Sequence, residues 1–411
     1  MTLYPENVLL PTKHLRVFHK VARLASMSKA AEELRRAPSA VAHSIRQLEL
    51  SLGATLFERT ARGMMLTEAG KILVKRVECA FEEMQTVRAK LDEMHRDTDG
   101  ARLHDPPIFS LAVNERRLAV LIAFSKRKHM GEVAKQMQIS QPAVSMALRD
   151  LEGSTGLMLF DRSTPVVRLT SAGELLLMHL KRALVQLRLA FAEIAALNGV
   201  MEGHVLVGAL PFGRAHILPT AIARIHKKYP LLHFTTIEGP FETLANALWC
   251  GDLDLILGSM PPVEHYSDLV REEIFGDRMA VIVRADHPLV NSGVPSMSQL
   301  LASYWVLPIQ GTPTREVLNT IFETLGISEP RVAVESSDLS VIRGLLFNSD
   351  MITVASQHLF EPEIRSGLLA ALPVELPQIR RPIGILRRKQ DHSSPGAQLL
   401  IEEIRSIHTT S

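Results

Sequence analysis

The chain has 411 residues, of which 46% are hydrophobic, and its 46 lysines and arginines nearly balance its 44 aspartates and glutamates. This length predicts two to four domains with cores of their own, and no low-complexity segment interrupts them. The first eleven residues lack the basic and apolar regions of a signal peptide, and no apolar run reaches the roughly 18–20 residues of a membrane span.

The two cysteines, Cys79 and Cys250, form no CxxC pair. This usage fits a reduced cytoplasm, which is the expected location, with no membrane partner. Buried structural thiols are favoured over a redox-sensing pair.

Positive charge is concentrated in two segments. From Lys13 to Gly70 there are ten basic and five acidic residues, and from Glu115 to Gly173 there are nine and five. The net charges are +5 and +4, so the remainder of the chain carries about −7. Basic modules joined to an acidic remainder are typical of a nucleic-acid-binding protein with a second function, although solvated helix faces can also be basic.

The two basic segments repeat each other. Leu15 to Gly70 aligns with Leu118 to Gly173 at a constant offset of 103 residues, without insertion or deletion. Such constant spacing indicates a duplicated domain.

Each copy predicts a helix-turn-helix followed by a β wing. In copy one we expect a helix over 15–22, a short helix over 29–34 capped by Ser28, and a second helix from Pro38 or Ser39 through Leu48. Copy two repeats the pattern over 130–137 and 142–151. The second helix of such a unit enters the major groove. Arg59 and Arg62 lie in the predicted wing, where they would meet phosphates.

A long helix follows each copy. Leu73, Val77, Ala80, Met84, Val87, Leu91 and Met94 alternate steps of four and three, as do Leu176, Leu180, Ala183, Leu187, Ala190, Ile194 and Leu197. These are coiled-coil seams, with an amphipathic helix packed on its own domain as the alternative. Because the loop over 96–107 is long enough to fold back, we slightly favour pairing within one chain over pairing between chains.

The C-terminal half alternates strands and helices. Strands are predicted over 205–209, 232–238, 251–258, 279–284, 304–307, 331–335 and 351–355. The alternation indicates α/β layering with mainly parallel strands, and ligands of such sheets bind beyond the carboxyl ends of the strands.

At these residues the chain resembles the LysR-type transcriptional regulators. Copy two carries Ser140-Gln-Pro-Ala-Val-Ser145, Leu148-Arg149, Leu151-Glu152, Gly156, Leu159-Phe160, Arg162 and Leu169-Thr-Ser-Ala-Gly173. The resemblance implies a winged helix-turn-helix that contacts bases through Gln141, Pro142, Ser145 and Arg149 and phosphates through Arg162 and Arg168, with Ser140 also at the DNA interface. Gln suits adenine and Arg suits guanine in the major groove. The alternative for Arg149 is a salt bridge to a neighbouring acid.

Copy one departs from the family pattern. Ala37-Pro38-Ser39-Ala40-Val41-Ala42 stands where the family has Ser-Gln-Pro-Ala-Val-Ser, which leaves Ser39, His43 and Arg46 as candidate DNA contacts. We therefore expect copy one to bind mainly the DNA backbone and copy two to contact bases.

The acidic half resembles the LysR-type effector domain, which has the two-lobed fold of type 2 periplasmic binding proteins. Gly251-Asp-Leu-Asp254 and Asp286-His-Pro-Leu289 match that family. A narrower likeness to regulators of galactose-binding protein is carried by Leu210–Arg214, Glu238–Glu242, Gly311–Pro313, Glu335–Ser337 and Arg343–Leu346. In the family the long helix forms the dimer contact.

The expected fold is therefore α+β and multidomain. Its parts are copy one (12–70), a linker helix (71–97), a connector (98–114), copy two (115–173), a second linker helix (174–199) and an effector domain (203–411). Lobe I is expected at about 203–270 and 380–411, and lobe II at about 275–375.

Candidate effector contacts lie in loops after strands: Pro211, Phe212, Gly213, Arg214, Ser259, Gln310, Thr312 and Ser336. Arg214 would bind a carboxylate or phosphate at the start of its helix. A helix N-cap is an equal alternative for each Ser or Thr, and a surface charge is the alternative for Arg214.

Chemistry other than binding finds little support in the sequence. Asp252 and Asp254 are expected to cap a turn or face solvent, and His287 is expected to be a loop residue. No metal-ligand spacing, phosphate-binding loop or nucleophile elbow is present, so no cofactor, metal or enzymatic activity is expected.

The sequence therefore predicts a transcriptional regulator that binds double-stranded DNA and a small organic effector, either a sugar, a sugar acid or an aromatic acid. A homo-oligomer through the linker helices is expected, and RNA polymerase is a candidate partner. The alternatives are an enzyme with a DNA module, a solute-binding protein, and a regulator whose copy one binds protein.

Overall fold

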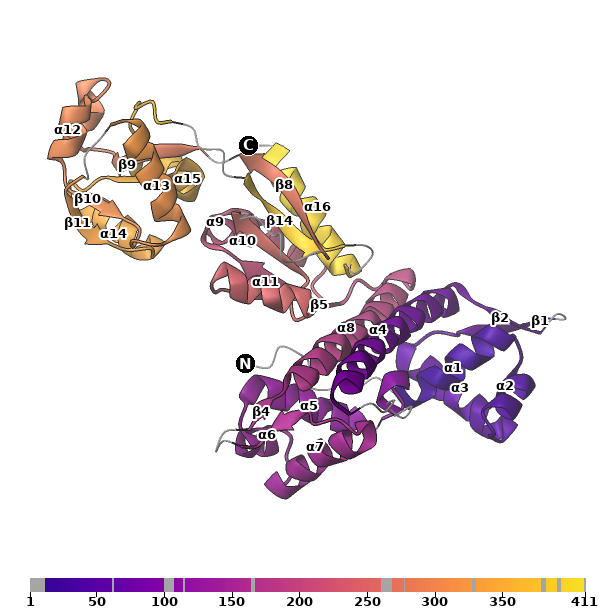
Figure 1. Ribbon diagram of the computed structural model, residues 1–411. Coiled ribbons are helices and arrows are strands. Elements are labelled where there is room, and N and C mark those ends of the chain that lie inside the picture. Colours follow the sequence, from indigo (N-terminus) through magenta and orange to yellow (C-terminus); the bar gives the residue numbers. More distant parts are fainter. Residues whose placement is uncertain are drawn as a thin grey trace.

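The computed structural model describes residues 12–60, 63–99, 107–113, 115–163, 167–259, 268–276, 278–326, 330–377, 382–389 and 393–409. Within these ranges, no helix has both the length and the apolar character needed to cross a membrane. The chain forms a helical half that contains both repeats and a two-lobed α/β half (Figure 1).

The two repeats fold alike, element by element. Copy one comprises α1 (Thr12–Leu24), α2 (Met27–Glu33), α3 (Pro38–Leu52), β1 (Phe57–Thr60) and β2 (Gly63–Leu66). Copy two comprises α5 (Glu115–Arg127), α6 (Met130–Gln136), α7 (Gln141–Thr155), β3 (Phe160–Asp161) and β4 (Arg168–Leu169). The three helices of the copies begin and end 103 residues apart, which confirms the predicted winged helix-turn-helix duplication. The expected cap of α2 was wrong, because Ser26 rather than Ser28 accepts the hydrogen bond from the Lys29 amide.

The repeated sequence motif holds the wing of each copy against its second helix-turn-helix element, α3 or α7, called the recognition helix below. The Glu49 Oε1 atom accepts a hydrogen bond from the Leu56 amide at 2.8 Å, and the Glu152 Oε1 atom accepts one from the Leu159 amide at 3.0 Å. A carboxylate that accepts amide hydrogens at the start of a strand satisfies donors that have no helical partner. The same Leu-Glu pair thus has the same structural role in both copies.

A glycine allows each wing to approach the helix that follows it. A Cβ atom on Gly70 would lie 2.2 Å from the Leu56 carbonyl oxygen, and one on Gly173 would lie 2.2 Å from the Leu159 carbonyl oxygen. No other residue fits without a backbone shift, which explains the Ala-Gly that ends each motif.

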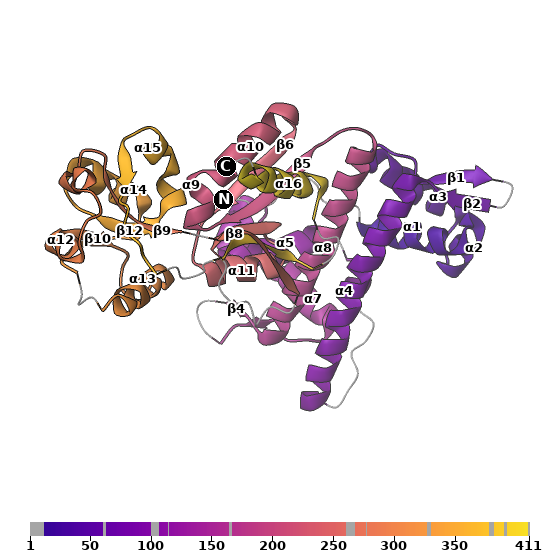
Figure 2. The same ribbon diagram turned by 90° about the horizontal axis from the view of Figure 1, so that it is seen from above.

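The linker helices α4 (Glu68–Asp99) and α8 (Ser171–Leu197) pack antiparallel in the same chain (Figures 1 and 2). Arg76, near the start of α4, contacts Glu193, near the end of α8, whereas Glu83 in the middle of α4 contacts Arg182. The seam residues from Leu73 to Leu91 and from Leu176 to Ile194 are all buried. Pairing within one chain is therefore confirmed. The expectation of a homo-oligomer through these helices stays a prediction; within this chain the seams from Leu73 to Leu91 and from Leu176 to Ile194 are covered, whereas the outer seam residues Met94 and Leu197 are exposed.

Lobe I of the α/β half has a five-stranded sheet in the order β6-β5-β7-β14-β8. Its elements are β5 (Gly203–Ala209), α9 (Pro211–Ala215), α10 (Ile217–Lys228), β6 (Leu232–Ile237), α11 (Phe241–Trp249), β7 (Leu255–Ser259), β8 (Leu269–Gly276), β14 (Pro382–Arg388) and α16 (Pro395–Thr409). The core between α10, α16 and the sheet is formed by residues such as Val207, Leu257 and Leu400.

Lobe II has two small sheets, in the orders β12-β9-β13 and β10-β11. Its elements are β9 (Met279–Arg284), η2 (Pro288–Ser292), α12 (Met297–Ala302), β10 (Trp305–Leu307), α13 (Pro313–Thr324), β11 (Val332–Glu335), α14 (Leu339–Asn348), β12 (Thr353–Ser356), η3 (Gln357–Phe360), α15 (Glu361–Arg365) and β13 (Leu369–Ala371). A short helix, η1 (Pro107–Ser110), precedes copy two and packs on α4.

Two expectations about these sheets need correction. The strands are not mainly parallel: β5 pairs with β6 and β7 in parallel and so do β10 and β11, but the pairs of β14 with β7 and β8 and of β9 with β12 and β13 are antiparallel. Strand β8 was not among the predicted strands; it spans the expected boundary between the lobes and pairs along its length with β14 in lobe I. The cause is that the chain leaves lobe I through β8 and returns as β14, beside it and reversed.

Candidate nucleic-acid interface and effector cleft

Helix α7 presents the predicted base-contacting residues of copy two on an exposed face. The Ser140 hydroxyl caps the helix by accepting a hydrogen bond from the Ala143 amide at 3.3 Å. Gln141, Pro142 and Arg149 are exposed and Ser145 is half-buried. In the described part of the chain no acid forms an ion pair with Arg149, since its neighbour Asp150 pairs with Arg117. The salt-bridge alternative for Arg149 is therefore wrong.

Helix α3 of copy one has the same place but a different start. Its N-cap residue is Ala37, which makes no side-chain cap, and Pro38 occupies its first turn. Ser39, His43 and Arg46 are all exposed, at the spacing of one helix face. The missing amide side chain and the missing cap are thus one local change, from Ser-Gln-Pro to Ala-Pro-Ser.

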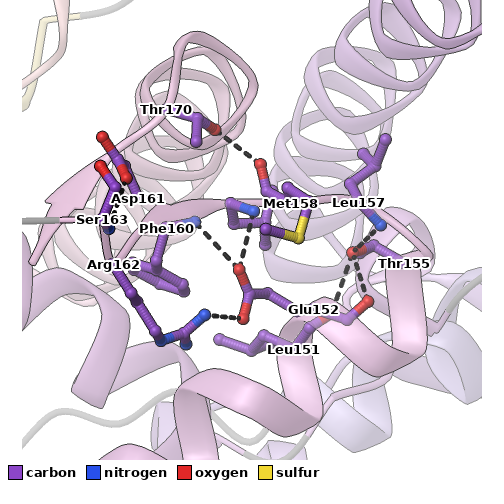
Figure 3. A network of polar contacts seen from close by, with 11 residues as sticks. Leu151, Glu152, Thr155, Leu157, Met158, Phe160, Asp161, Arg162, Ser163 and Thr170 are labelled. Atoms are coloured by element: carbon purple, nitrogen blue, oxygen red, sulfur yellow. Dashed lines mark hydrogen bonds and ion pairs between the residues drawn. The ribbon is translucent and has the colours of Figure 1, made fainter. Parts of the chain in front are cut away.

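The wing arginines differ in their freedom to meet phosphate. The Arg162 Nη1 atom lies 2.7 Å from the Glu152 Oε2 atom, and its guanidinium stands 5.5 Å from the Phe160 ring centroid (Figure 3). Arg59 and Arg168 are exposed, whereas Arg62 lies outside the described residues. To bind a DNA phosphate, Arg162 would have to give up its ion pair with Glu152. In the described part of the wing Arg168 forms no ion pair that it would have to give up.

A basic hollow of about 600 Å³ lies beside α3 in copy one. Lys13, His14, Arg36 and His43 line it together with polar residues. Burial lowers the pKa of His14, and the neighbouring cations Lys13, His43 and Arg36 lower it further. The concentration of positive charge is suited to binding anionic oxygens such as those of a DNA backbone.

The candidate effector residues lie at the carboxyl ends of parallel strands in both lobes. Arg214 follows β5 and Ser259 ends β7, which are neighbours in lobe I; Gln310 follows β10 and Ser336 follows β11, which are neighbours in lobe II. Arg214 forms an ion pair with Glu238 at the end of β6. Its charge also helps to lower the pKa of Asp338 in lobe II, after the larger effect of the Ser340 amide hydrogen bond. The charge of Arg214 therefore acts on an acid of lobe II as well as on its partner in lobe I.

Pro211, Phe212 and Gly213 have structural tasks that the sequence did not reveal. Pro211 occupies the first turn of α9. Phe212 is buried against Ile383 and packs edge-on to His358 of η3, with ring centroids 6.1 Å apart. A Cβ atom on Gly213 would lie 2.7 Å from the Leu257 carbonyl oxygen. Phe212 thus joins the two lobes instead of forming an open wall, and Gly213 lets α9 approach β7.

In lobe II Thr312 is the N-cap of α13, as its alternative predicted, whereas Ser336 is not a helix N-cap, because Asp338 caps α14. The Thr312 hydroxyl caps α13 and donates to the Ile309 carbonyl oxygen at 2.7 Å, and the Ser336 hydroxyl accepts from the Asp338 amide at 3.2 Å. Gln310 is exposed and Ser259 is half-buried.

Sequence reasoning missed Arg315, which is only 1% exposed. Its guanidinium donates to the Pro308 carbonyl oxygen at 3.1 Å and to the Glu335 carboxylate at 3.0 Å. It thereby ties together the loops that carry Thr312 and Ser336. An arginine in the first turn of an amphipathic helix gives no signal in the sequence that it is buried.

Asp252 and Asp254 join the α/β half to the linker helix α8. The Lys181 Nζ atom lies 2.6 Å from Asp252, and the Arg188 Nη2 atom lies 2.6 Å from Asp254, whose second oxygen accepts from the Leu206 amide at 2.8 Å. The Asp254 side chain is fully buried. The expectation that these acids cap a turn or face solvent was wrong. Their partners lie 66–71 residues earlier in the chain, where spacing gives no indication of contact.

One further arginine completes this junction. Arg182 lies 3.0 Å from Glu83 of α4 and 3.4 Å from Asp268 before β8. The loop after α11 packs closely as well, since a Cβ atom on Gly251 would lie 2.8 Å from Val185. We call Lys181, Arg182, Arg188 and their three aspartates, Asp252, Asp254 and Asp268, the linker junction.

His287 has a structural role, and Cys79 and Cys250 are free thiols that are half-buried. His287 accepts the Leu289 amide at its Nδ1 atom and is buried. Burial raises the pKa of both thiols, Cys79 and Cys250. Across the described ranges, no cluster of His, Cys, Asp and Glu could hold a metal ion.

Comparison with known protein families matches both halves of the chain. Residues 12–71 and 116–174 each match the family described as "Bacterial regulatory helix-turn-helix protein, lysR family", and residues 198–408 match the "LysR substrate binding domain".

Three similar proteins illustrate the match. The HTH-type transcriptional regulator GalR of Pseudomonas putida is 39% identical over 98% of this chain and 99% of its own length. The uncharacterized HTH-type transcriptional regulator YdcI of Escherichia coli is 31% identical over 72% of this chain and 97% of its own length. The full-length structure of an OxyR variant from Pseudomonas aeruginosa is similar in fold, with a TM-score of 0.53, 24% identity, and coverage of 70% of this chain and 96% of that one.

Proposed function

Because the chain belongs to the LysR family of DNA-binding transcriptional regulators, we propose that it contacts duplex DNA through α3 and α7 and responds to a small organic anion bound between its lobes. The observation that carries the DNA contact is the exposed face of α7. Gln141 and Arg149 lie there on a capped helix, with no acid in the described structure paired to Arg149. An amide and a guanidinium suit adenine and guanine edges.

The wings and the hollow of copy one supply phosphate contacts in this proposal. Arg59 and Arg168 are exposed, and Lys13, Arg36 and His43 surround the hollow. Contacts of this kind orient a protein on DNA without selecting sequence. RNA polymerase is proposed as a further partner of the DNA-bound protein.

An effector with a carboxylate suits this site because Arg214 lies at the carboxyl ends of the parallel strands of lobe I. Glu238 is paired with Arg214 and is 70% exposed, so an incoming carboxylate can replace it at small cost. Among sugars, sugar acids and aromatic acids, the two classes of acid are therefore favoured. The guanidinium would hold the carboxylate, while Ser259 and Gln310 would face the rest of the molecule.

The linker junction gives the effector a route to the DNA-binding half. Lobe I is held to α8 by Asp252 and Asp254, and Arg182 continues the contact to α4. An effector can shift an equilibrium only if it binds the two states with different affinity. A change in how the lobes close would supply that difference and would be transmitted through these ion pairs.

The experiment is a thermal-shift screen of the full chain with a panel of sugars, sugar acids and aromatic acids. We expect an acid to raise the melting temperature and Arg214→Ala to abolish the shift while DNA binding remains. Arg224→Ala is the control, because Arg224 forms an exposed ion pair with Glu403 on α16. If an acid still raised the melting temperature of the Arg214→Ala variant, the role of Arg214 would be overturned. If the full chain retarded no DNA in a gel-shift assay, the proposed DNA contact would be overturned.

A further inference from the structure

The linker helices pair as two identical subunits would. Arg76 of α4 donates to Gln186 at 3.0 Å and pairs with Glu193 of α8. His179 of α8 contacts Glu83 at 2.6 Å and Lys90 at 3.4 Å, both in α4. Adding the repeat offset of 103 to residues 76, 83 and 90 gives residues 179, 186 and 193. The two sets of contacts are therefore the same contacts, exchanged by a twofold axis across the helix pair.

The heads must follow the same relation. Each helix-turn-helix packs on its own linker helix, α1 on α4 and α5 on α8. The two linker helices begin at equivalent residues, Glu68 and Ser171. A twofold axis between the linker helices therefore also relates the two recognition helices, as in a symmetric dimer. Dimers of helix-turn-helix proteins bind two half-sites related by the twofold axis of the DNA. In this chain the whole arrangement is complete within one polypeptide.

The two recognition faces are not equivalent. Met146 of α7 is 62% exposed on the same face as Pro142 and Arg149. Exposure of this apolar side chain to water does not stabilise the free protein. The equivalent residue of α3 is His43, beside the basic hollow. An apolar side chain in the major groove suits the thymine methyl group, whereas a histidine can bond a base nitrogen or oxygen.

The residues that surround the two faces also differ, and those of copy one are the more basic. The hollow of copy one is lined by His14, Arg36 and Gln47. The equivalent residues of copy two are Arg117, Ile139 and Asp150, and Arg117 is bound to Asp150 at 2.7 Å. The charge of Arg117 is thereby neutralised by Asp150, and Arg36 of copy one is replaced by the apolar Ile139. Copy two thus offers the DNA Met146 and the Gln141 amide beside Arg149, whereas copy one offers it a more basic surface.

We propose that a single chain binds an operator of two different half-sites in one fixed orientation, with α7 and Met146 on a thymine-containing half-site and α3 and His43 on the other. This rests on the proposed DNA binding. Two identical heads would bind an inverted repeat in either direction, but a chain with two unlike heads has only one preferred direction.

The experiment is selection of binding sites from random duplex DNA with the full chain, followed by competition between the selected site and two symmetric sites built from either half. We expect the selected sequences to have two unlike halves, and the native site to bind more tightly than either symmetric site. Met146→His should lower the preference for thymine in one half by roughly fourfold, the factor for burying one methyl group, and should leave the other half unchanged.

The repeat itself provides the matched variant. His43→Met places the residue of copy two in copy one, and it should change only the second half-site, toward thymine. An inverted repeat as the selected site, or single substitutions that alter both halves alike, would overturn the proposal while leaving DNA binding itself intact. A chain that selects no sequence at all would instead overturn the proposed function.

Discussion

Arg76 and His179 occupy equivalent positions in the two repeats, and each contacts the other repeat's linker helix at equivalent places. Arg76 pairs with Glu193, and His179 pairs with Glu83. The two residues have diverged in chemistry, yet both remain 3% exposed at the side chain and both bind a carboxylate. The interface has therefore kept its geometry while its two halves became distinct, as expected when a dimer contact is enclosed in one chain.

Arg76→Ala should destabilise the helical half. It removes the hydrogen bonds to Gln186 and Glu193 and leaves a carboxylate without its partner, so we expect a loss of about 2 kcal/mol in the free energy of unfolding. Urea unfolding measures it. Lys71→Ala on the same helix is the control, because the Lys71–Glu68 pair is more than half exposed and should contribute less than about 1 kcal/mol. Equal losses in both variants would contradict the buried pairing.

Gly173→Ala should destabilise the protein by about 3 kcal/mol, because the new methyl group would meet the Leu159 carbonyl oxygen and force the wing away from α8. Gly153→Ala, in α7, has nothing within 4 Å of the new Cβ and should stabilise the helix by about 0.5–1 kcal/mol. The two melting temperatures should therefore move in opposite directions; a shared direction would refute the role of Gly173.

Arg188→Ala should weaken the linker junction. Asp254 would keep the Leu206 amide but lose its ion pair while its side chain is buried, which costs about 3 kcal/mol. Urea unfolding again supplies the measurement, with the exposed pair of Arg224→Ala as the control. We also expect faster hydrogen exchange at the Leu206 amide. Unchanged exchange there would separate Asp254 from the contact with α8.

Stability should fall as the pH is lowered below about 6.5. Burial lowers the pKa of His204 from its usual value of 6.5, and His233 and Arg188 lower it further. The unfolded chain therefore binds a proton at a higher pH than the folded chain, so protonation favours unfolding below 6.5 until the folded pKa is reached. His14 and His19 are shifted in the same direction, also chiefly by burial. His204→Gln should reduce the slope of stability against pH between pH 7 and 5.5, and an unchanged slope would exclude His204 as a contributor.

The sequence predicts those features that depend on local spacing. The offset of 103 residues predicted the helices of copy two from those of copy one, and the seams from Leu73 and Leu176 predicted two packed linker helices. Most strands of the α/β half also lie within a few residues of their predicted places, because apolar runs between turns mark them.

Features that depend on distant contacts could not be predicted. Strand β14 lies beside β8 although more than 100 residues separate them, and its direction follows from the chain's return to lobe I. The sequence predicted that Phe212 would form an apolar wall of the effector site. In the structure it instead packs against His358 of η3, an element far away in the sequence. Asp252 and Asp254 looked like turn residues because their cationic partners belong to α8.

The central claim is that α4 and α8 of the same chain pair with each other, and cross-linking tests it most directly. Cysteines would replace Glu83 and Arg182, whose side chains lie 3.0 Å apart, in a chain with Cys79→Ser and Cys250→Ser. Equal amounts of ¹⁴N-labelled and ¹⁵N-labelled protein, mixed after unfolding and refolding together, would be joined with a short bismaleimide. We expect every cross-linked peptide pair to be of one isotope and to come from a single chain. Mixed isotopes in half of the pairs would contradict the claim and show that the linker helices join two chains.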